Sequence, residues 1–503
     1  MNYVLGVDIG TQGTKTVLIS EVGQCLAQAF HGSNIIKNIG GTIEEDPEEQ
    51  FQAVCKTIKE CIVKSGVRPS NIASLAIAGQ MAGIIGIGKE GRNVTPYDSW
   101  LDSRCHDYIK KMQLEVGDEV LENTGNFPST NHGPKILWWK NERPNIFKRI
   151  HSIVQPGAYC AMRLCGLNAS KAFIDYTYLH FTGFANIHDC TWNGKLCDKY
   201  GIEQEKLPRI VNPETRVGYV VKAMEIHTGL MEGTPIIAGC GDTSASLLST
   251  GATKAGICVD VAGTASVFAT TTTEFVMDSK EKSIGCGRAV MNGLWHPYAY
   301  IKGGGMNIEW FLREIANRGN TDNLLGSDFT LDKLNLLISS LITKRSDPLF
   351  IPHLGGRVCP NNPDLRGAWL NLSWQHSIAH LYKAVLEGVA LEYALYMNIF
   401  KEISKNFSPE EVRSVGGGAK SKEWNQIKAD VLGLPVVRLK REVGAPMGAA
   451  LLAGYGVGLF MNLDETMNKW MTFGDKVTPD LQNTNLIYNE RIDTYKKLID
   501  KLI

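Results

Sequence analysis

Hydrophobic and polar positions near the start of the chain follow the pattern of β-strands. Residues 3–20 (YVLGVDIGTQGTKTVLIS) hold two runs rich in Val, Ile and Leu on either side of a Gly/Thr turn, which predicts a β-hairpin. Further strands are expected at residues 25–30 (CLAQAF) and 74–79 (SLAIAG). With a helix before the last of them, the order strand, strand, strand, helix, strand is typical of an α/β or α+β fold.

That helix is predicted from residues 44–64 (EEDPEEQFQAVCKTIKECIVK). Asp46 is the expected N-cap, Pro47 the first helical residue and Glu49 the third position of a capping box. Apolar residues then recur at helical spacing, and the face expected to be buried consists of Phe51, Val54, Cys55, Ile58 and Ile62.

A later passage repeats the opening pattern. Residues 256–276 (GICVDVAGTASVFATTTTEFV) again hold a β-rich run, a Gly-Thr turn and a second β-rich run. This weak repeat predicts two related halves, with domains at residues 1–250 and 251–503. Asp8 lies two residues before Gly10, whereas Asp260 lies three before Gly263. Because strand side chains alternate between faces, only Asp8 should face whatever the two glycine turns share.

The second half also contains strong helical patterns. Long helical periodicity marks residues 376–403, and a C-terminal stripe consists of Ile492, Tyr495, Leu498, Ile499 and Leu502. Residues 444–463 carry no charge and are long enough to span a membrane. Their five glycines, one proline and several alanines favour a buried, closely packed helix instead.

Composition narrows the class of protein. A chain of 503 residues is too long to fold around a single hydrophobic core. Its 52 basic and 52 acidic residues balance, so no net charge attracts nucleic acid or an anionic membrane. The twelve cysteines form no CxxC pair, and Asp8 and Lys15 interrupt any apolar leader. We therefore expect reduced thiols in the cytoplasm, without a disulfide framework or a zinc site.

Three glycine-rich turns are candidate phosphate sites: residues 8–15 (DIGTQGTK), 260–266 (DVAGTAS) and 414–424 (SVGGGAKSKEW). Successive backbone N–H groups in such turns can bind phosphate oxygens, although each could also be an ordinary hairpin turn. None fits the P-loop pattern, and no GxGxxG follows a strand as a nicotinamide-dependent dehydrogenase would require. A fourth cluster, residues 302–305 (KGGG), predicts close helix packing.

Two stretches could carry the chemistry. In residues 234–252 (TPIIAGCGDTSASLLSTGA), Asp242 follows an apolar strand and opens a predicted helix, where it is either a helix cap or a general base for phosphoryl transfer. Residues 79–105 resemble a small-molecule pocket that ends in Trp100, Asp102 and Arg104. Trp100 could instead belong to a core, and Asp102 and Arg104 could pair with other groups.

Seven motifs together resemble one family. DIGTQGTK, GQMAG, WLDSRC, GCGDTSAS, GTAS, NNPDLRGAW and GGGAKSKEW follow the order and spacing of the FGGY carbohydrate kinases, with the greatest likeness to the xylulokinase group. The resemblance covers essentially the whole chain. It implies an α/β, two-domain, duplicated actin/hexokinase-like (ribonuclease H-like) ATPase fold with an interdomain cleft, which binds ATP and Mg²⁺. Family members are often homodimers.

The resemblance also assigns roles by position. Asp242 matches the catalytic base, and Asp8 matches the acid that holds hydrated Mg²⁺. The residues that match ATP and phosphate contacts are Gly10, Thr11, Gln12, Gly263, Thr264, Gly417, Gly418, Ala419 and Ser421. The residues that fall where the family gathers its substrate contacts are Gln80, Met81, Ala82, Trp100, Asp102, Arg104 and Thr243.

The implied reaction is transfer of phosphate from ATP to a primary hydroxyl of a ketopentose. D-Xylulose, giving D-xylulose 5-phosphate, is the first expectation. Ala82, Leu101 and Thr243 stand where xylulokinases commonly have His, Asn and Asn, so pocket residues differ in hydrogen-bonding capacity. L-Xylulose, ribulose and short polyols such as erythritol or glycerol therefore remain alternative acceptors. A non-catalytic ATP-binding regulator is disfavoured because both acids are present.

Overall fold

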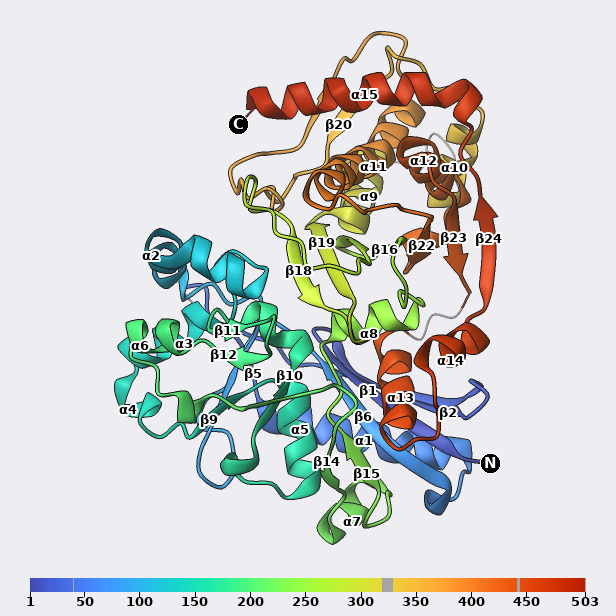
Figure 1. Ribbon diagram of the computed structural model, residues 1–503. Helices are drawn as coiled ribbons and strands as arrows, with labels where there is room; N and C mark the ends of the chain where they lie inside the picture. Colours follow the sequence, from blue (N-terminus) through green and yellow to red (C-terminus); the bar gives the residue numbers. More distant parts are fainter. Residues whose placement is uncertain (39, 319–328, 441–443, 503) are drawn as a thin grey trace. The chain divides into compact units, whose positions relative to one another are not determined.

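The computed structural model describes residues 1–38, 40–318, 329–440 and 444–502. The chain forms two compact units (Figure 1). Unit 1 comprises Met1–Thr253, Cys286–Trp295 and the described part of Val443–Met471. Unit 2 comprises Lys254–Gly285 and the described parts of His296–Glu442 and Thr472–Ile503. Two later segments of the chain thus return to the unit formed by the first 253 residues.

Unit 1 is built on a six-stranded sheet in the order β14-β15-β6-β1-β2-β3. The predicted hairpin is confirmed as β1 (Tyr3–Gly10) and β2 (Gly13–Ser20), which pair antiparallel, and β3 (Cys25–Gly32) extends it. On the other side, β1 pairs parallel with β6 (Ile72–Gly79), which pairs parallel with β15 (Pro235–Ile237). The antiparallel strand β14 (Arg216–Tyr219) ends the sheet.

Helix α1 (Pro47–Ser65) confirms the expected start and the expected face. The Asp46 side chain accepts the Glu48 backbone N–H at 2.8 Å, so the cap bond goes to the second helical residue rather than to Glu49. All five predicted apolar residues are buried. They pack with Leu5, Val7 and Ile9 of β1 and with α5 (Pro156–Cys165) in one hydrophobic core.

The opposite face of β1 is covered by α13 (Ala445–Gly456) and α8 (Asp242–Ser249). Figure 1 shows α13, in orange-red, beside the blue strands β1 and β6. A Cβ atom on Gly6 would lie 1.9 Å from the Pro446 carbonyl oxygen, and one on Gly448 would lie 2.1 Å from the Ala245 carbonyl oxygen. The small residues of α13 therefore permit very close packing, as the sequence predicted.

Short strands and helices complete unit 1. The strands are β4 (Ile36–Lys37), β5 (Ile43–Glu45), β7 (Ile85–Ile87), β8 (Tyr97–Asp98), β9 (Ser152–Val154), β10 (Phe173–Asp175), β11 (Ala185–Asn186), β12 (Thr191–Trp192) and β13 (Arg209–Val211). The helices are α2 (His106–Thr124), α3 (His132–Glu142), α4 (Pro144–Phe147), α6 (Gly194–Tyr200), α7 (Glu225–Thr228) and α14 (Leu463–Trp470). β18 (Gly285–Arg288) spans the point where the chain passes from unit 2 to unit 1.

Six strands of the seven-stranded sheet of unit 2 repeat the pattern of parallel and antiparallel pairing seen in unit 1. The sheet of unit 2 contains, in consecutive order, β19 (Trp295–Ile301), β17 (Ser266–Thr270), β16 (Ile257–Ala262), β22 (Glu411–Val415), β23 (Val436–Leu439) and β24 (Phe473–Val477). Pairing is antiparallel from β19 to β16, parallel from β16 to β23 and antiparallel at β24. This is the pattern from β3 to β14 in unit 1, so the repeat seen in the sequence is a duplicated sheet.

Asp260 confirms the prediction made from its offset. Its carboxylate is fully buried, accepts hydrogen bonds from the Tyr393 and Ser414 hydroxyls, and forms an ion pair with Lys428. Tyr393 belongs to α11 (Ile378–Ile403) and Lys428 to α12 (Lys422–Leu432). Asp260 thus faces the helices that cover its sheet, in the position that Val7 holds in unit 1.

The predicted long helices are present in unit 2. Helix α11 fits residues 376–403, and the C-terminal stripe lies on α15 (Leu481–Leu502), where Tyr495 and Ile499 are buried and Leu502 is exposed. The other elements are α9 (Gly304–Phe311), α10 (Leu331–Ser339), β20 (Leu349–Ile351) and β21 (Ala368–Leu370). Across the described part of the chain, none of the helices has the length and hydropathy needed to cross a bilayer.

Candidate active site

Asp242 is the first residue of α8, at the point where the chain leaves β15. The residue before it is fixed from two sides, because Gly241 bridges Gly79 of β6 and its N–H donates to the Thr177 hydroxyl at 3.0 Å. Asp242 Oδ1 accepts the Thr243 N–H at 2.6 Å and the Thr243 hydroxyl at 3.3 Å. Among the described residues, Oδ2 has no hydrogen-bond partner. One oxygen therefore stabilises the helix start while the other is available for chemistry.

Burial shifts the protonation of this carboxyl group. Loss of solvent raises the pKa of Asp242 to about 6, although the two hydrogen bonds from Thr243 act in the opposite direction. A carboxylate with a pKa just below neutrality is ionised at pH 7 and still accepts a proton readily. Both roles expected from the sequence are therefore compatible in Asp242: it can accept a hydrogen bond at the start of α8 and it can act as a base.

Asp8 lies near Asp242, towards the end of β1. Its Oδ1 atom is buried and has no hydrogen-bond partner among the described residues. Burial, followed by the negative charge of Asp242, raises the pKa of Asp8 well above its usual range, while Lys15 lowers it. A Cβ atom on Gly10 would lie 3.6 Å from Asp8 Oδ2, so the carboxylate borders the hairpin turn.

These two carboxylates fit a divalent cation. Hard oxygen atoms are the ligands that Mg²⁺ prefers, and Mg²⁺ usually keeps several water molecules and binds through one or two carboxylates. A buried, unpartnered oxygen beside a second carboxylate is costly unless a cation or a proton neutralises it. The donor set thus suits Mg²⁺ at Asp8, directly or through water.

The first glycine turn contacts the predicted sugar loop, residues 79–105. Thr11 and Gln12 form the tip between β1 and β2, and Gln12 is exposed. The Thr11 hydroxyl accepts the Trp100 Nε1–H at 2.9 Å and donates to Gln80 Oε1 at 3.4 Å. Ser33 donates its hydroxyl to the Thr11 carbonyl at 2.5 Å. Trp100 is 40% exposed, so it is not a core residue.

Gln80 connects this turn to a buried acid. Its Nε2 group donates to Glu45 Oε1 at 2.9 Å, and its own N–H donates to the Ile9 carbonyl at 3.0 Å. Glu45 Oε2 accepts from Gln50 Nε2 at 3.0 Å. Burial raises the pKa of Glu45, and the two amide bonds oppose this shift. The structure therefore brings together Thr11, Gln80 and Trp100 and adds Glu45, which the sequence analysis did not single out.

Two neighbouring residues, Gly241 and His132, contact Met81 in the GQMAG loop. Met81 is buried with its terminal methyl group next to Gly241, and Ala82 is half-buried. His132, the first residue of α3, lies 2.6 Å from the Met81 carbonyl through Nε2. Burial lowers the pKa of His132 to about 4, so the ring is neutral at pH 7 and Nε2–H is the donor. His132 thus positions the loop.

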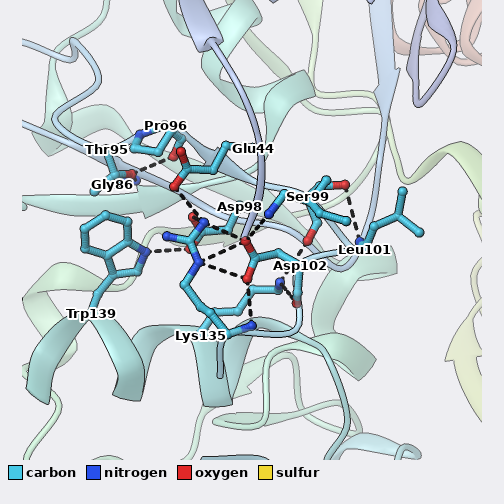
Figure 2. Close-up of polar contacts among 12 residues, drawn as sticks. Glu44, Gly86, Thr95, Pro96, Asp98, Ser99, Leu101, Asp102, Lys135 and Trp139 are labelled. Carbon is cyan, nitrogen blue, oxygen red and sulfur yellow. Dashed lines mark hydrogen bonds and ion pairs between the residues drawn. The ribbon is translucent and has the colours of Figure 1, made fainter. Parts of the chain in front are cut away.

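Asp102 and Arg104 form an ion pair with each other, and Arg104 also pairs with Glu44. Figure 2 shows Glu44, Asp98 and Asp102 gathered in this cluster. Asp102 is fully buried, and its oxygens accept from Arg104 Nε at 2.9 Å, Arg104 Nη2 at 2.5 Å and the Ile43 N–H at 2.7 Å. Arg104 Nη2 also donates to Glu44 Oε1 at 2.6 Å. This corresponds to the alternative left open by the sequence, in which the two residues pair with other groups.

Helix α3 supplies the other side of this cluster. Figure 2 shows Lys135 and Trp139 rising from one helix towards Asp98 and Asp102. Lys135 Nζ donates to the Ser99 and Asp102 carbonyls at 2.8 and 3.0 Å, and Trp139 Nε1 donates to Asp98 Oδ2 at 2.5 Å. Burial raises the pKa of Asp98 to about 6, against the nearby charges of Lys135 and Arg104. The cluster fixes the segment that carries Trp100.

In unit 2, the second glycine turn is braced by a helix. Gly263 and Thr264 lie between β16 and β17, and their carbonyls accept the N–H groups of Gly305 and Met306 at 2.9 and 3.0 Å. A Cβ atom on Gly304 would lie 1.8 Å from the Ser266 hydroxyl. The KGGG cluster therefore provides the close helix packing that was predicted, and it does so against this turn.

The third turn follows β22 and leads into α12. A Cβ atom on Gly418 would lie 2.3 Å from the Trp424 ring, whereas nothing lies within 4 Å of one on Gly417. Ala419 is buried, and Ser421 caps α12 by accepting the Trp424 N–H at 3.1 Å. The space beside Gly417 is thus open, whereas the neighbouring Gly418 packs against the Trp424 ring. The Ser421 hydroxyl is already used in the helix cap.

Sequence reasoning missed Glu45, Tyr97 and the positioning role of His132. Glu45 precedes a helix cap and resembles the other acids around it. Tyr97 lies in a two-residue strand without a clear pattern. The pairing of β5 with β8 places Glu45 opposite Tyr97, and this pairing has no counterpart in local periodicity. A run of consecutive acids at residues 44–46 was the only available signal.

The duplicated sheet and its glycine turns define a class of protein, the actin/hexokinase-like α/β ATPases. Residues 3–249 match the N-terminal domain of the FGGY family of carbohydrate kinases, and residues 258–457 match the C-terminal domain of that family. The chain therefore belongs to the FGGY carbohydrate kinases and is a sugar kinase. Kinases of this family use ATP as their phosphate donor.

Several relatives cover the chain almost completely. The xylulose kinase of Bacillus subtilis is 27% identical over 99% of this chain and 97% of its own length. The gluconokinase of the same organism is 28% identical over 92% of this chain and 89% of its own length. The crystal structure of xylulose kinase from Rhodospirillum rubrum superposes with a TM-score of 0.90 at 23% identity, covering 100% and 99% of the two chains. This last likeness concerns the fold alone.

Proposed function

We propose that this sugar kinase transfers the γ-phosphate of ATP to a primary hydroxyl of a ketopentose. D-Xylulose is the first candidate, giving D-xylulose 5-phosphate; L-xylulose, ribulose and short polyols such as erythritol or glycerol are the alternatives. The observation that carries the proposal is the unbonded Oδ2 atom of Asp242 at the head of α8, beside the unpartnered oxygen of Asp8.

Asp242 acts as the general base. Its Oδ2 atom accepts the proton of the acceptor hydroxyl as that oxygen attacks the γ-phosphorus. The bond between the γ-phosphorus and the bridging oxygen breaks, and ADP leaves with that oxygen. Thr243 keeps Oδ1 occupied by its N–H and hydroxyl, so the reactive oxygen has a fixed direction.

Asp8 would hold hydrated Mg²⁺ through its unpartnered Oδ1 atom. The ion would neutralise the negative charge of the phosphates. Asp8 itself would orient the hydrated ion beside the hairpin turn, because its carboxylate borders Gly10. Gly10, Thr11 and Gln12 would offer backbone N–H groups to phosphate oxygens. The Thr11 hydroxyl is bonded to Gln80 and Trp100, so its part is to join this turn to the sugar loop.

In unit 2, the proposal assigns the nucleotide to two turns. Gly263 and Thr264 would bind phosphate, and Gly417, Gly418, Ala419 and Ser421 would line the adenine and ribose. Support comes from the adjacency of the turns, since β16 and β22 are parallel neighbours and a Cβ atom on Gly416 would lie 2.7 Å from the Ala262 carbonyl oxygen. Parallel strands with turns at their carboxyl ends commonly form ligand sites.

The acceptor would lie against the sugar loop, near Gln80, Met81, Ala82, Trp100 and Thr243. Asp102 and Arg104 would contribute by holding the Trp100 segment, since their polar atoms are bonded within the cluster of Figure 2. The twelve cysteines all lie in the described part of the chain and none forms a disulfide there, which suits a reducing compartment such as the cytoplasm. Homodimer formation remains a prediction from the family resemblance.

Acceptor-dependent formation of ADP tests the proposal. The protein is incubated with ATP and Mg²⁺ alone and then with D-xylulose, L-xylulose, ribulose, erythritol or glycerol. We expect ADP to form rapidly with at least one of them and at background rate with ATP alone. Tight binding of ATP with background ADP formation across the whole panel would instead identify a non-catalytic ATP-binding protein.

A further inference from the structure

The hydroxyl of Tyr97 is a buried polar group without a partner. Tyr97 is 0% exposed, and its Oη atom makes no hydrogen bond with any described residue. Buried hydroxyl groups are almost always hydrogen-bonded, because leaving water without a replacement bond is costly. An orphaned hydroxyl beside a candidate active site therefore indicates a missing partner.

Three contacts place this hydroxyl beside residues 79–83 (GQMAG), the acceptor loop. Tyr97 of β8 pairs directly with Glu45 of β5, so their side chains share one face of the ladder. Glu45 is bonded to Gln80 of the loop at 2.9 Å. A Cβ atom on Gly83 would lie 2.3 Å from Tyr97 Cζ, the carbon that bears the hydroxyl. The Tyr97 hydroxyl thus lies close to the acceptor loop, and that loop begins at Gly79, which bridges the residue before Asp242.

The surroundings of this hydroxyl carry an excess of negative charge. Burial and then the charges of Glu45, Asp242 and Asp98 raise the pKa of Tyr97 well above its usual range. Asp8 adds a further carboxylate near Asp242. Among the residues that the structure describes, the Glu45 carboxylate is bonded only to the neutral amides of Gln80 and Gln50.

The neighbouring cations are already matched by acids or carbonyls. Arg104 lies within 3.6 Å of carboxylate oxygens of Glu44, Asp98 and Asp102. Lys135 is bonded to two backbone carbonyls. Lys15 lies within electrostatic reach of Asp8 and lowers its pKa. Within the described part of unit 1, no cation pairs with Glu45 or adjoins the Tyr97 hydroxyl.

We propose that the Tyr97 hydroxyl and the Glu45 carboxylate form an acceptor subsite that binds a hydroxyl group of an uncharged ketose or polyol. The Tyr97 O–H donates to the acceptor oxygen, and Glu45 accepts the acceptor O–H through a remaining lone pair. An aldonate carboxylate has no proton to give Glu45 and is repelled by the surrounding acids. The flexible side chain of Met81, in the same loop, moves to admit the acceptor.

This inference deepens the proposed function and rests on it for the position of the acceptor. It also separates two classes of relatives, because both a xylulose kinase and a gluconokinase resemble the chain at nearly equal identity. The subsite selects the uncharged acceptor. Neither Glu45 nor Tyr97 was identified from the sequence motifs, because only the pairing of β5 with β8 brings them together.

The test combines acceptor titrations with three variants. Acceptor binding is measured by calorimetry, and turnover by ADP release, with D-xylulose, L-xylulose, ribulose, erythritol, glycerol and D-gluconate. For the best neutral acceptor, Tyr97→Phe should raise Kd and KM about three- to tenfold, the scale of one hydrogen bond, with kcat and the KM for ATP little changed. The matched control is Tyr159→Phe, in the same core, whose hydroxyl is bonded to Asn93 and Arg163. It should leave the acceptor KM unchanged.

Charge selection is tested with D-gluconate. In the wild-type protein its kcat/KM should lie at least about 10²-fold below that of the best neutral acceptor, as expected for like charges held close together. Glu45→Gln keeps an amide oxygen that can accept from Gln80 and removes the charge. It should raise the ratio of gluconate to neutral kcat/KM at least about tenfold.

The outcomes separate this inference from the proposed function. Equal effects of Tyr97→Phe and Tyr159→Phe on the acceptor KM, or a preference for D-gluconate, would overturn the subsite; the former result would mean that Tyr97 binds only water. Binding of a neutral acceptor that weakens in Tyr97→Phe, without any ADP formation, would support the subsite and reject the kinase reaction. Failure of every acceptor to bind would overturn both.

Discussion

At the scale of single residues, the site depends on how Asp242 divides its two oxygens. Oδ1 accepts both hydrogen bonds from Thr243, which is the usual behaviour of an acid at a helix start. Oδ2 remains available, and burial raises the pKa of the group to about 6. Structural and chemical roles that the sequence presented as alternatives are therefore combined in one side chain.

The raised pKa predicts the pH dependence of activity. A base must be ionised to accept a proton, so kcat/KM should fall about tenfold per pH unit below a pKa near 6, the folded-state value of Asp242. A steady-state pH profile with the best acceptor measures this limb. An acidic limb near pH 4, the usual value for an aspartate, would show that Asp242 is not the group that titrates.

The same shift has a consequence for stability with the opposite sign. The folded state binds the Asp242 proton more tightly than the unfolded state, whose pKa is near 3.8. This group therefore favours folding below about pH 4 and loses that contribution as the pH rises towards 6. Asp242→Asn should gain about 1–2 kcal/mol of stability at pH 8, after allowance for partial exposure, and little at pH 3.5. Denaturant unfolding at the two pH values checks this expectation.

Residue chemistry was predictable where a motif carried it. Asp8 and Asp242 were singled out because Asp8 lies near the end of a strand before a glycine turn, and Asp242 follows a strand and opens a helix. Glu45 and Tyr97 were not, because their proximity is created by pairing between a three-residue and a two-residue strand. Asp102 and Arg104 were identified as a pair of interest, but only the fold shows that Glu44, Asp98 and Lys135 surround them.

At the scale of elements, the close approach of α13 to β1 organises unit 1. The uncharged, glycine- and alanine-rich sequence of residues 444–456 made a packed helix predictable, but its partner strand, more than 400 residues earlier, was not. The hairpin of β1 and β2 and the face of α1 were predictable because their periodicity is regular over many residues. The short strands β4, β5 and β8 lack such periodicity, since two or three residues cannot establish a pattern.

This packing predicts a strong effect of one methyl group. Gly6→Ala would place a Cβ atom 1.9 Å from the Pro446 carbonyl oxygen, so β1 and α13 would have to separate. We expect a loss of stability of about 3 kcal/mol or more, at the upper end for overpacked cores, together with reduced activity because β1 also carries Asp8. Thermal or denaturant unfolding measures the change.

Gly32→Ala is the matched control for that substitution. Gly32 ends β3 of the same sheet, and a Cβ atom there would meet its nearest neighbour only at 4.0 Å. Its stability should change by no more than about 0.5 kcal/mol. Similar losses in the two variants would mean that the close packing of α13 on β1 does not determine the stability of unit 1.

At the scale of the whole molecule, the chain contains two copies of one sheet pattern that carry different polar residues. Unit 1 supplies Asp8, Asp242 and the acceptor loop, whereas unit 2 has an inward-facing Asp260 in a buried ion pair and two glycine turns at neighbouring strand ends. The weak repeat in the sequence was enough to predict duplication. The return of residues 444–471 to unit 1 was not predictable, because α13 has no local mark of its destination.

The proposed phosphate transfer depends on the catalytic role of Asp242, and turnover by Asp242→Asn tests this role most directly. Single-turnover and steady-state ADP release are measured with the best acceptor, together with ATP affinity, and Asp107→Asn, an exposed acid in the first turn of α2, serves as control. The account predicts that Asp242→Asn lowers kcat at least about 10²-fold, retains ATP binding and leaves the control unaffected. Turnover of Asp242→Asn close to that of the wild-type protein would contradict it.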